Sequence, residues 1–201
     1  MTLLDLKRGS GMFFRAGYLS GDRGRVPVSQ SNGTAFTGGW EITAMGPMTF
    51  QASVTYALTD RYVVDPFKDD SVRRTGPFKD DILLIEASMR LNLTGRKTWR
   101  NLAPYITAGT GMAISEGSPT DSSGYSFGKK ATFTFGAGFR LYATRRINLA
   151  FDARAVMWRL RYPPDFKRVS SPDGIPILQV EDPDKDWTVH PLLSFGVGWA
   201  F

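Results

Sequence analysis

The chain has 201 residues, of which 42 % are hydrophobic and 13 % aromatic, and its formal net charge at pH 7 is +6. It contains no cysteine, which excludes disulfides, thiolate metal sites and thiol catalysis. No stretch approaches the roughly 20 apolar residues that a membrane-spanning helix requires. The first ten residues show no signal peptide, so an exported protein would correspond to the mature chain.

An alternation of large apolar side chains with small or polar ones recurs along the chain, and a period of two is that of a β-strand. In each such segment one face is nearly free of charge, while the other carries glycines, hydroxyl groups and the charged side chains. No segment long enough to form a helix shows the apolar spacing i, i+3, i+4, i+7 of an amphipathic helix. We expect eight strands, near residues 11–20, 35–46, 49–59, 82–94, 103–115, 131–143, 147–158 and 187–201.

The expected connections alternate between short and long. The short ones are Gly46-Pro47, 95–102 and 144–146, and the long ones are 20–35, 59–81, 115–130 and 159–186. An even number of strands joined in this way is typical of transmembrane barrels, in which every backbone group is paired. We therefore predict a single all-β domain over residues 1–201: an eight-stranded antiparallel up-and-down transmembrane β-barrel with short periplasmic turns and long extracellular loops. The alternative is a soluble cup of the lipocalin kind, which would instead bury its large residues and expose its charges.

Three stretches, PYITAGTGMA (Pro104–Ala113), FTFGAGFRLY (Phe133–Tyr142) and the terminal LLSFGVGWAF, resemble the eight-stranded outer-membrane barrels of the OmpA and OmpX type. The resemblance implies the outer membrane of a Gram-negative-type bacterium, with outer-membrane lipids, lipopolysaccharide and the barrel-assembly machinery as partners. It also implies that the last strand carries the assembly signal, formed by Leu193, Phe195, Val197, Trp199 and Phe201. Fold does not determine function, so the resemblance leaves the function open.

The inward face of the predicted barrel is polar. It carries Arg15, Glu41, Gln51, Glu86, Arg90, Tyr105, Arg140, Tyr142, Asp152, Arg154 and His190. An eight-stranded barrel is just wide enough to be filled by its own side chains, and an unpaired buried charge is strongly unfavourable. We therefore predict a salt-bridged plug, and a gated ion or proton path is the alternative.

The net charge comes from the predicted turns and the N-terminal segment. Basic residues gather there, opposed only by Asp5: Lys7, Arg8, Arg96, Lys97, Arg100, Arg145 and Arg146. We expect these side chains to reach phospholipid headgroups, and a periplasmic acidic partner is the alternative. No basic stripe is interleaved with aromatic residues, so we expect no nucleic acid.

The sequence predicts no catalytic, metal or cofactor site. His190 and Ser194 share a strand face but are about 13 Å apart at about 3.3 Å per residue, beyond the reach of a base and its nucleophile. A cross-strand serine or threonine beside His190 remains open. The paired aspartates of the repeated PFKDD, at 66–70 and 77–81, lack the spacing of a calcium loop.

The same PFKDD repeat predicts a hairpin-like flap in which Phe67 and Phe78 contact a protein partner or lipopolysaccharide. The segment 115–126 is predicted to be solvated and flexible. We predict a monomer with a structural or interaction role: envelope stability, adhesion or partner binding through the loops. One alternative is a carrier of small hydrophobic ligands or an ion channel. A carrier would need an apolar pocket, and the predicted inward face offers only four large apolar residues for it: Phe13, Leu19, Leu84 and Leu192. The other alternative is a lipid A-modifying enzyme.

Overall fold

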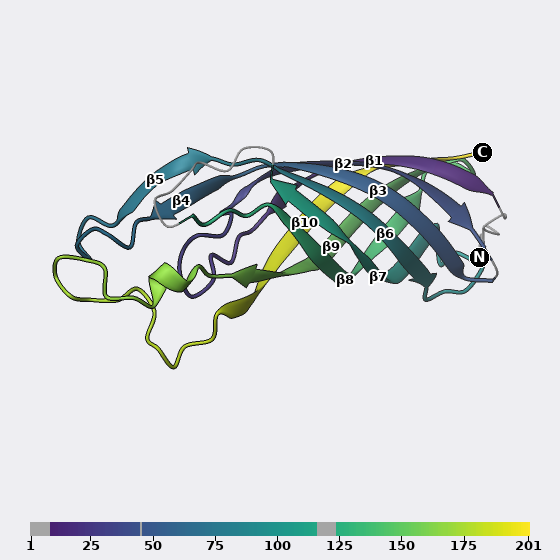
Figure 1. The fold of residues 1–201 in the computed structure, drawn as a ribbon. Helices are drawn as coiled ribbons and strands as arrows, with labels where there is room; N and C mark the ends of the chain where they lie inside the picture. Colours follow the sequence, from purple (N-terminus) through teal and green to yellow (C-terminus); the bar gives the residue numbers. More distant parts are fainter. Residues whose placement is uncertain (1–8, 45, 116–123) are drawn as a thin grey trace.

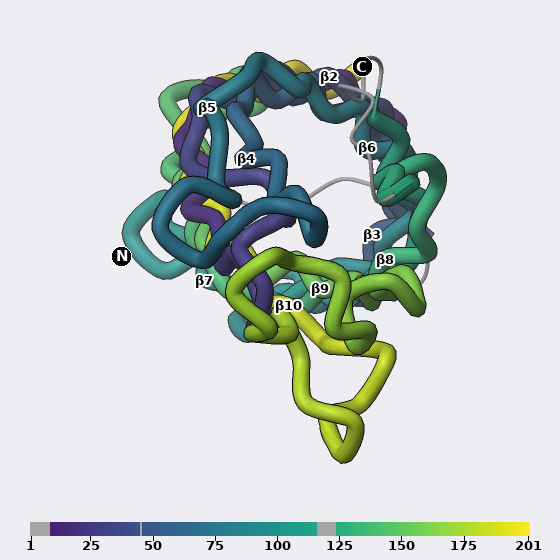
Figure 2. The backbone as a smooth tube through the Cα atoms, turned by 60° about the vertical axis from the view of Figure 1, so that its left-hand side comes forward, coloured from purple at the N-terminus to yellow at the C-terminus, as the bar shows by residue number. Residues whose placement is uncertain are grey.

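The computed structural model describes residues 9–44, 46–115 and 124–201, and within them eight strands close into an antiparallel barrel. Each strand pairs with its neighbour along the chain, and β1 pairs with β10 to close the ring (Figures 1 and 2). The barrel strands are β1 (Ser10–Leu19), β2 (Gly33–Thr43), β3 (Met48–Leu58), β6 (Ile82–Asn92), β7 (Leu102–Ser115), β8 (Lys129–Tyr142), β9 (Ile147–Arg161) and β10 (Lys185–Ala200). No helix in the described part of the chain is long and apolar enough to cross a membrane.

The outer surface of the barrel is apolar. Every barrel strand alternates buried and exposed positions, as the period of two predicts. The exposed positions hold large hydrophobic side chains: Phe14 is 54 % exposed, Phe135 54 % and Phe195 57 %. Contiguous apolar surface of this kind marks a surface that is covered in the working protein.

The two ends of the barrel differ. The short connections between β2 and β3, β6 and β7, and β8 and β9 lie at the end that holds the C-terminus, here called the turn end (Figure 1). The long connections lie at the opposite, loop end. They include a two-stranded sheet of β4 (Asp60–Val64) and β5 (Arg74–Lys79), and the short helix η1 (Pro164–Phe166).

The repeated PFKDD motif occupies two different places in the β4–β5 hairpin. The second copy begins within β5, where Phe78 pairs with Arg61 of β4. The first copy, from Pro66 to Asp70, lies in the turn that joins the two strands. The two copies are thus equal in sequence but not in structure.

Several strand ends differ from the expected ones. The structure starts β2 at Gly33 and ends it at Thr43, rather than spanning 35–46. The strand expected over 147–158 continues to Arg161, where it pairs with Lys185 of β10. The sequence misses this extension because the outward positions change there from apolar residues to arginine, although the hydrogen-bonded ladder continues.

The β1–β10 seam does not run the full length of β10. The paired residues run from Gly11 and Ala200 to Leu19 and Leu192. One further hydrogen bond follows, in which the N–H of Ser20 donates to the carbonyl oxygen of Pro191 at 2.7 Å. Beyond it, β10 continues towards Lys185 with β9 as its only strand partner among the described residues.

Candidate functional site

The charged side chains in the turn half of the lumen gather around one carboxylate. Glu41 of β2 accepts hydrogen bonds from both terminal nitrogens of Arg140 on β8, at 2.7 and 2.6 Å. It also accepts one from Arg90 of β6 and one from Gln51 of β3, each at 3.0 Å. This Glu41 cluster joins four strands and places two guanidinium groups around a single carboxylate.

A second group of charges lies around Asp152. Its carboxylate accepts from Arg154 Nε at 2.5 Å and from the Tyr105 hydroxyl at 2.7 Å, and it pairs with Arg15 at 3.4 Å. Arg154 also donates to Glu86 at 2.5 Å. These five residues form the Asp152 cluster, in which Arg15, Arg154 and Asp152 are all buried.

Small residues on the inward face make room for these side chains. A Cβ atom at Gly196 would lie 2.0 Å from the carbonyl oxygen of Phe14 and 2.8 Å from Cγ of Arg15. At Gly138 it would lie 2.6 Å from the Tyr105 hydroxyl. At both positions the nearest atom belongs to the backbone of the neighbouring strand, and the side chains of Arg15 and Tyr105 lie just beyond it, so neither position has room for a side chain.

Little space remains above the Asp152 cluster. Thr37 of β2 and its cross-strand neighbour Thr55 of β3 share a hydrogen bond of 2.8 Å on the lumen wall. The void beside them, which Leu84 and Leu192 also line, has a volume of about 10 Å³. A cavity of that size holds at most about one water molecule.

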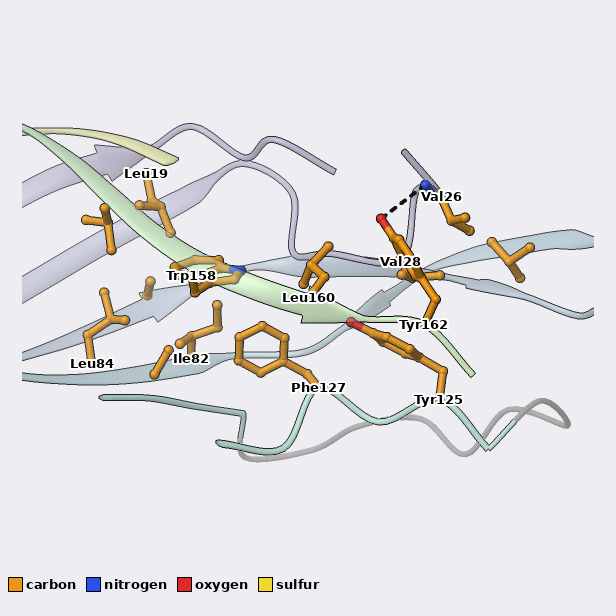
Figure 3. Packing of buried hydrophobic residues seen from close by; sticks show 14 of the residues in the cluster. Leu19, Val26, Val28, Ile82, Leu84, Tyr125, Phe127, Trp158, Leu160 and Tyr162 are labelled. Carbon is orange, nitrogen blue, oxygen red and sulfur yellow. Dashed lines mark hydrogen bonds between the residues drawn. The ribbon is translucent and has the colours of Figure 1, made fainter. Parts of the chain in front are cut away.

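The loop half of the lumen is filled by apolar side chains (Figure 3). Trp158 and Leu160 of β9 are fully buried there, together with Leu19, Ile82 and the loop residue Phe127. The indole of Trp158 meets the ring of Phe127 edge to face at a centroid distance of 5.7 Å. This apolar cluster also contains Val26, Val28, Leu84, Tyr125, Val156, Tyr162, Phe166, Leu178 and Leu192.

The apolar cluster corrects the expectation that Phe13, Leu19, Leu84 and Leu192 are the only large inward apolar residues. Val156, Trp158 and Leu160 continue the inward face of β9, partly beyond the residue at which that strand was expected to end. Phe13 lies elsewhere, in contact with the guanidinium of Arg15 at 4.3 Å from its ring centre. The sequence does contain a signal for this: large apolar residues still alternate in VMWRL (Val156–Leu160), which indicates that the strand continues past residue 158.

Two of the predicted lumen residues lie outside the charged clusters. His190 stacks on Trp158 with ring centres 3.7 Å apart, and its Nε2 contacts the Thr188 hydroxyl at 2.9 Å. Its neighbours are thus a threonine and an indole rather than Ser194, and the absence of a catalytic site stays a prediction. Tyr142 is half-buried at the turn end, where it lines a cavity with Arg140.

The long loops are tied to one another. Arg25 pairs with Asp182 at 2.5 Å, and the backbone N–H of Asp70 donates to Asp173 at 2.7 Å. Asp80 pairs with Arg61 at 3.1 Å, accepts from Gln30 and takes a short hydrogen bond from Ser115. These contacts join residues 20–32, 59–81 and 162–184 into one loop cap over the apolar cluster.

Tyr162 anchors the loop cap, and alkaline pH is expected to weaken it. Its hydroxyl accepts from the N–H of Val26 at 3.4 Å and donates to Asp186 at 3.2 Å. Burial raises the pKa of Tyr162 from 10.0 to about 12, and the nearby carboxylate of Asp186 adds to the rise. Because the folded pKa is the higher one, the stabilisation is complete below pH 10 and is lost as the pH rises through about 12.

The measurement is the urea midpoint of wild type and Tyr162→Phe at a series of pH values from 8 upward. The phenylalanine variant should lose less stability than wild type above the pKa of a free tyrosine, because it has no phenol to ionise. Parallel pH profiles for the two proteins would contradict this role of Tyr162.

The predicted assembly residues lie on the outward face of β10 and, for Phe201, directly after its end. Leu193, Trp199 and Phe201 are 53 %, 54 % and 65 % exposed, and Phe201 stacks on Trp40 of β2 at 5.7 Å. Phe195 and Val197 share this face. On the hairpin, Phe67 and Phe78 are 47 % and 40 % exposed. Lys7, Arg8 and most of the segment predicted to be flexible lie outside the described residues.

No protein-family model matches the chain, and no curated protein matches it. Among solved structures it is similar to neisserial surface protein A (NspA), with a TM-score of 0.59 and 13 % identity over 100 % of both chains. The chain has the fold of the eight-stranded outer-membrane β-barrels. The barrel is also similar to the outer membrane protein OprG from Pseudomonas aeruginosa, with a TM-score of 0.49 and 11 % identity over 96 % of this chain and 97 % of that one. At 13 % identity the likeness to NspA shows the fold alone.

Proposed function

We propose that the protein is an integral outer-membrane barrel with a plugged lumen, which acts through its loop cap in envelope stability, adhesion or partner binding. The observation that carries the proposal is the apolar outer surface, because large hydrophobic side chains cover the outward faces of the strands. Hydrocarbon covers such a surface, and closure of the barrel leaves no unpaired edge within it. In this orientation the turn end faces the periplasm and the loop cap faces outward.

The plug is inferred from the filling of the lumen. The Glu41 cluster, the Asp152 cluster and the apolar cluster follow one another along the barrel, with a void of only about 10 Å³ between the last two. A carrier of small hydrophobic ligands would need open space where Trp158, Leu160 and Phe127 are buried. The packing therefore supports a structural or interaction role over transport.

The loop cap is proposed as the surface that meets partners. Its contacts between loops hold Phe67 and Phe78 on an ordered hairpin, and exposed aromatic residues on ordered loops are suited to recognition. Lipopolysaccharide and a protein partner remain the two proposed kinds of contact. The outward row from Leu193 to Phe201 is proposed as the signal for the barrel-assembly machinery.

The test of membrane insertion is electrophoretic mobility with and without boiling. Refolded into detergent or lipid vesicles, the protein is expected to migrate as a compact, faster band when unboiled and as a slower band after boiling, because the hydrogen-bonded ring resists the denaturing detergent. Far-ultraviolet circular dichroism of the unboiled sample should be of the β type. Ready solubility as a β-rich monomer without detergent would contradict the proposal and favour a soluble cup.

A further inference from the structure

A cavity of about 740 Å³ lies inside the turn end of the barrel, on the side of the Glu41 cluster away from the loops. It reaches the turn between β2 and β3 at Gly46, the turn between β6 and β7 at Gly95 and the turn between β8 and β9 at Arg145. Its volume is that of a small-molecule site, since such sites span about 300–1,000 Å³. In this turn-end chamber the wall is built from the strands, which hold its shape.

The charged side chains that line the chamber are mainly basic. Among the described residues they are Arg90, Arg140, Arg145 and Arg146, against a single acidic side chain, Glu41. The carboxylate of Glu41 is fully engaged, since it accepts two hydrogen bonds from Arg140, one from Arg90 and one from Gln51. The two buried guanidinium groups therefore share one carboxylate, which leaves a net charge of +1 among the described residues of the cluster.

The two arginines at the mouth add to this excess. Arg145 and Arg146 are exposed on the turn between β8 and β9, and neither forms an ion pair with any described residue. Their side chains are long enough to turn towards the chamber or towards solvent. Counted over the described residues that line the chamber, four arginines against one glutamate leave three positive charges in excess, in a concave site that strengthens their field.

We propose that the turn-end chamber binds a small anion carrying several phosphate oxygens, held by Arg145 and Arg146 at the mouth and by the field of Arg90 and Arg140 at the base. Guanidinium groups suit this ligand because their planar N–H pairs match phosphate oxygens two at a time. The hydroxyl of Tyr142 and the amides of Asn92 and Asn148 line the same space and supply further polar contacts. A soluble phosphorylated compound and a phospholipid headgroup share this chemistry.

The test is a calorimetric titration of the refolded protein, in an uncharged detergent at low salt, with inorganic tripolyphosphate. Saturable binding of one tripolyphosphate per barrel is expected. Arg145→Gln combined with Arg146→Gln should weaken it about tenfold or more, because hydrogen bonds between charged groups are lost. The matched control is Arg96→Gln with Lys97→Gln, which removes the same charge from the neighbouring turn at residues that do not line the chamber.

The control pair is expected to change the affinity by no more than about twofold, because a screened surface charge outside the site contributes little. Equal weakening by the two double variants would overturn the proposal, since it would mean diffuse attraction to a basic rim. Absence of saturable binding to the wild type would overturn it as well. The shift between unboiled and boiled bands verifies that each variant is folded.

A second titration, with monomeric dihexanoylphosphatidylglycerol, separates the two sources of phosphate. Tighter binding of the lipid than of tripolyphosphate, lost in the Arg145 and Arg146 double variant, would assign the chamber to a headgroup. Tighter binding of tripolyphosphate than of the lipid, again lost in the Arg145 and Arg146 double variant, would assign the chamber to a soluble phosphorylated compound.

Discussion

Replacing Glu41 with glutamine is expected to destabilise the barrel by about 3 kcal/mol, the lower end of the cost of removing one partner from a buried ion pair. Glutamine preserves the shape of the side chain but removes the negative charge that Arg90 and Arg140 share. The two guanidinium groups of the Glu41 cluster are then left without the carboxylate that pairs with both. The lower end of the range applies because the turn-end chamber lets water reach this cluster from one side.

The matched control for this variant is Glu86→Gln. Its partner Arg154 keeps a second carboxylate, Asp152, at 2.5 Å, so no guanidinium group is left unpaired. We expect Glu86→Gln to lower the free energy of unfolding by about 1 kcal/mol, the net contribution of one hydrogen bond. The measurement is the free energy of unfolding in urea, with the protein in lipid vesicles. The folded fraction at each urea concentration is the fraction that migrates as the compact band in unboiled samples. Equal stabilities of Glu41→Gln and wild type would show that the Glu41 cluster does not stabilise the fold.

Replacing Trp158 with alanine is expected to cost about 3–5 kcal/mol, the loss typical of removing a large aromatic side chain from a packed interior. Trp158 is fully buried, meets Phe127 edge to face and stacks on His190. Its removal leaves a void at the junction of barrel and loop cap. The loops should therefore become accessible to protease before the barrel itself unfolds.

Trp187 provides the comparison, because it lies on the outward face of β10 and is 50 % exposed. Trp187→Ala should give a much smaller loss of stability and leave the loops protected. The readouts are the urea midpoint and the rate of trypsin cleavage at the loop arginines and lysines. Rapid loop cleavage in both variants, or in neither, would contradict the prediction that Trp158 in the apolar cluster keeps the loop cap ordered.

The alternation of side chains predicted the barrel because each strand obeys a local rule. Phe133, Phe135 and Phe139 alternate with threonine, glycine and arginine, and their outward exposure follows from the pleat alone. The same rule placed Glu41 and Arg140 inside the lumen. It could not pair them, because β2 and β8 are not neighbours in the ring and their contact depends on the register of every strand between them.

The alternation of side chains could not predict the apolar cluster and the loop cap, for a different reason. Phe127 and Val26 come from segments without any period, so nothing local indicates that they are buried. The contact of Arg25 with Asp182 joins residues far apart in the sequence, and charged loop residues of this kind usually read as solvated. The turn-end chamber is likewise invisible in the sequence, since it is the space that the side chains leave unfilled.

The proline at the end of the seam bears on how the barrel meets copies of itself. In an antiparallel ladder a residue directs its N–H and its carbonyl to the same neighbour, and Pro191 offers only the carbonyl to Ser20. The last residue that β10 contributes to the seam therefore lacks an N–H, and the unpaired edge of the strand begins beyond it. A strand from another molecule that displaced Ser20 could form only one of the two hydrogen bonds at this position, and proline at a strand edge disfavours edge-to-edge pairing. Pro191 is thus expected to oppose strand exchange at the point where the seam ends.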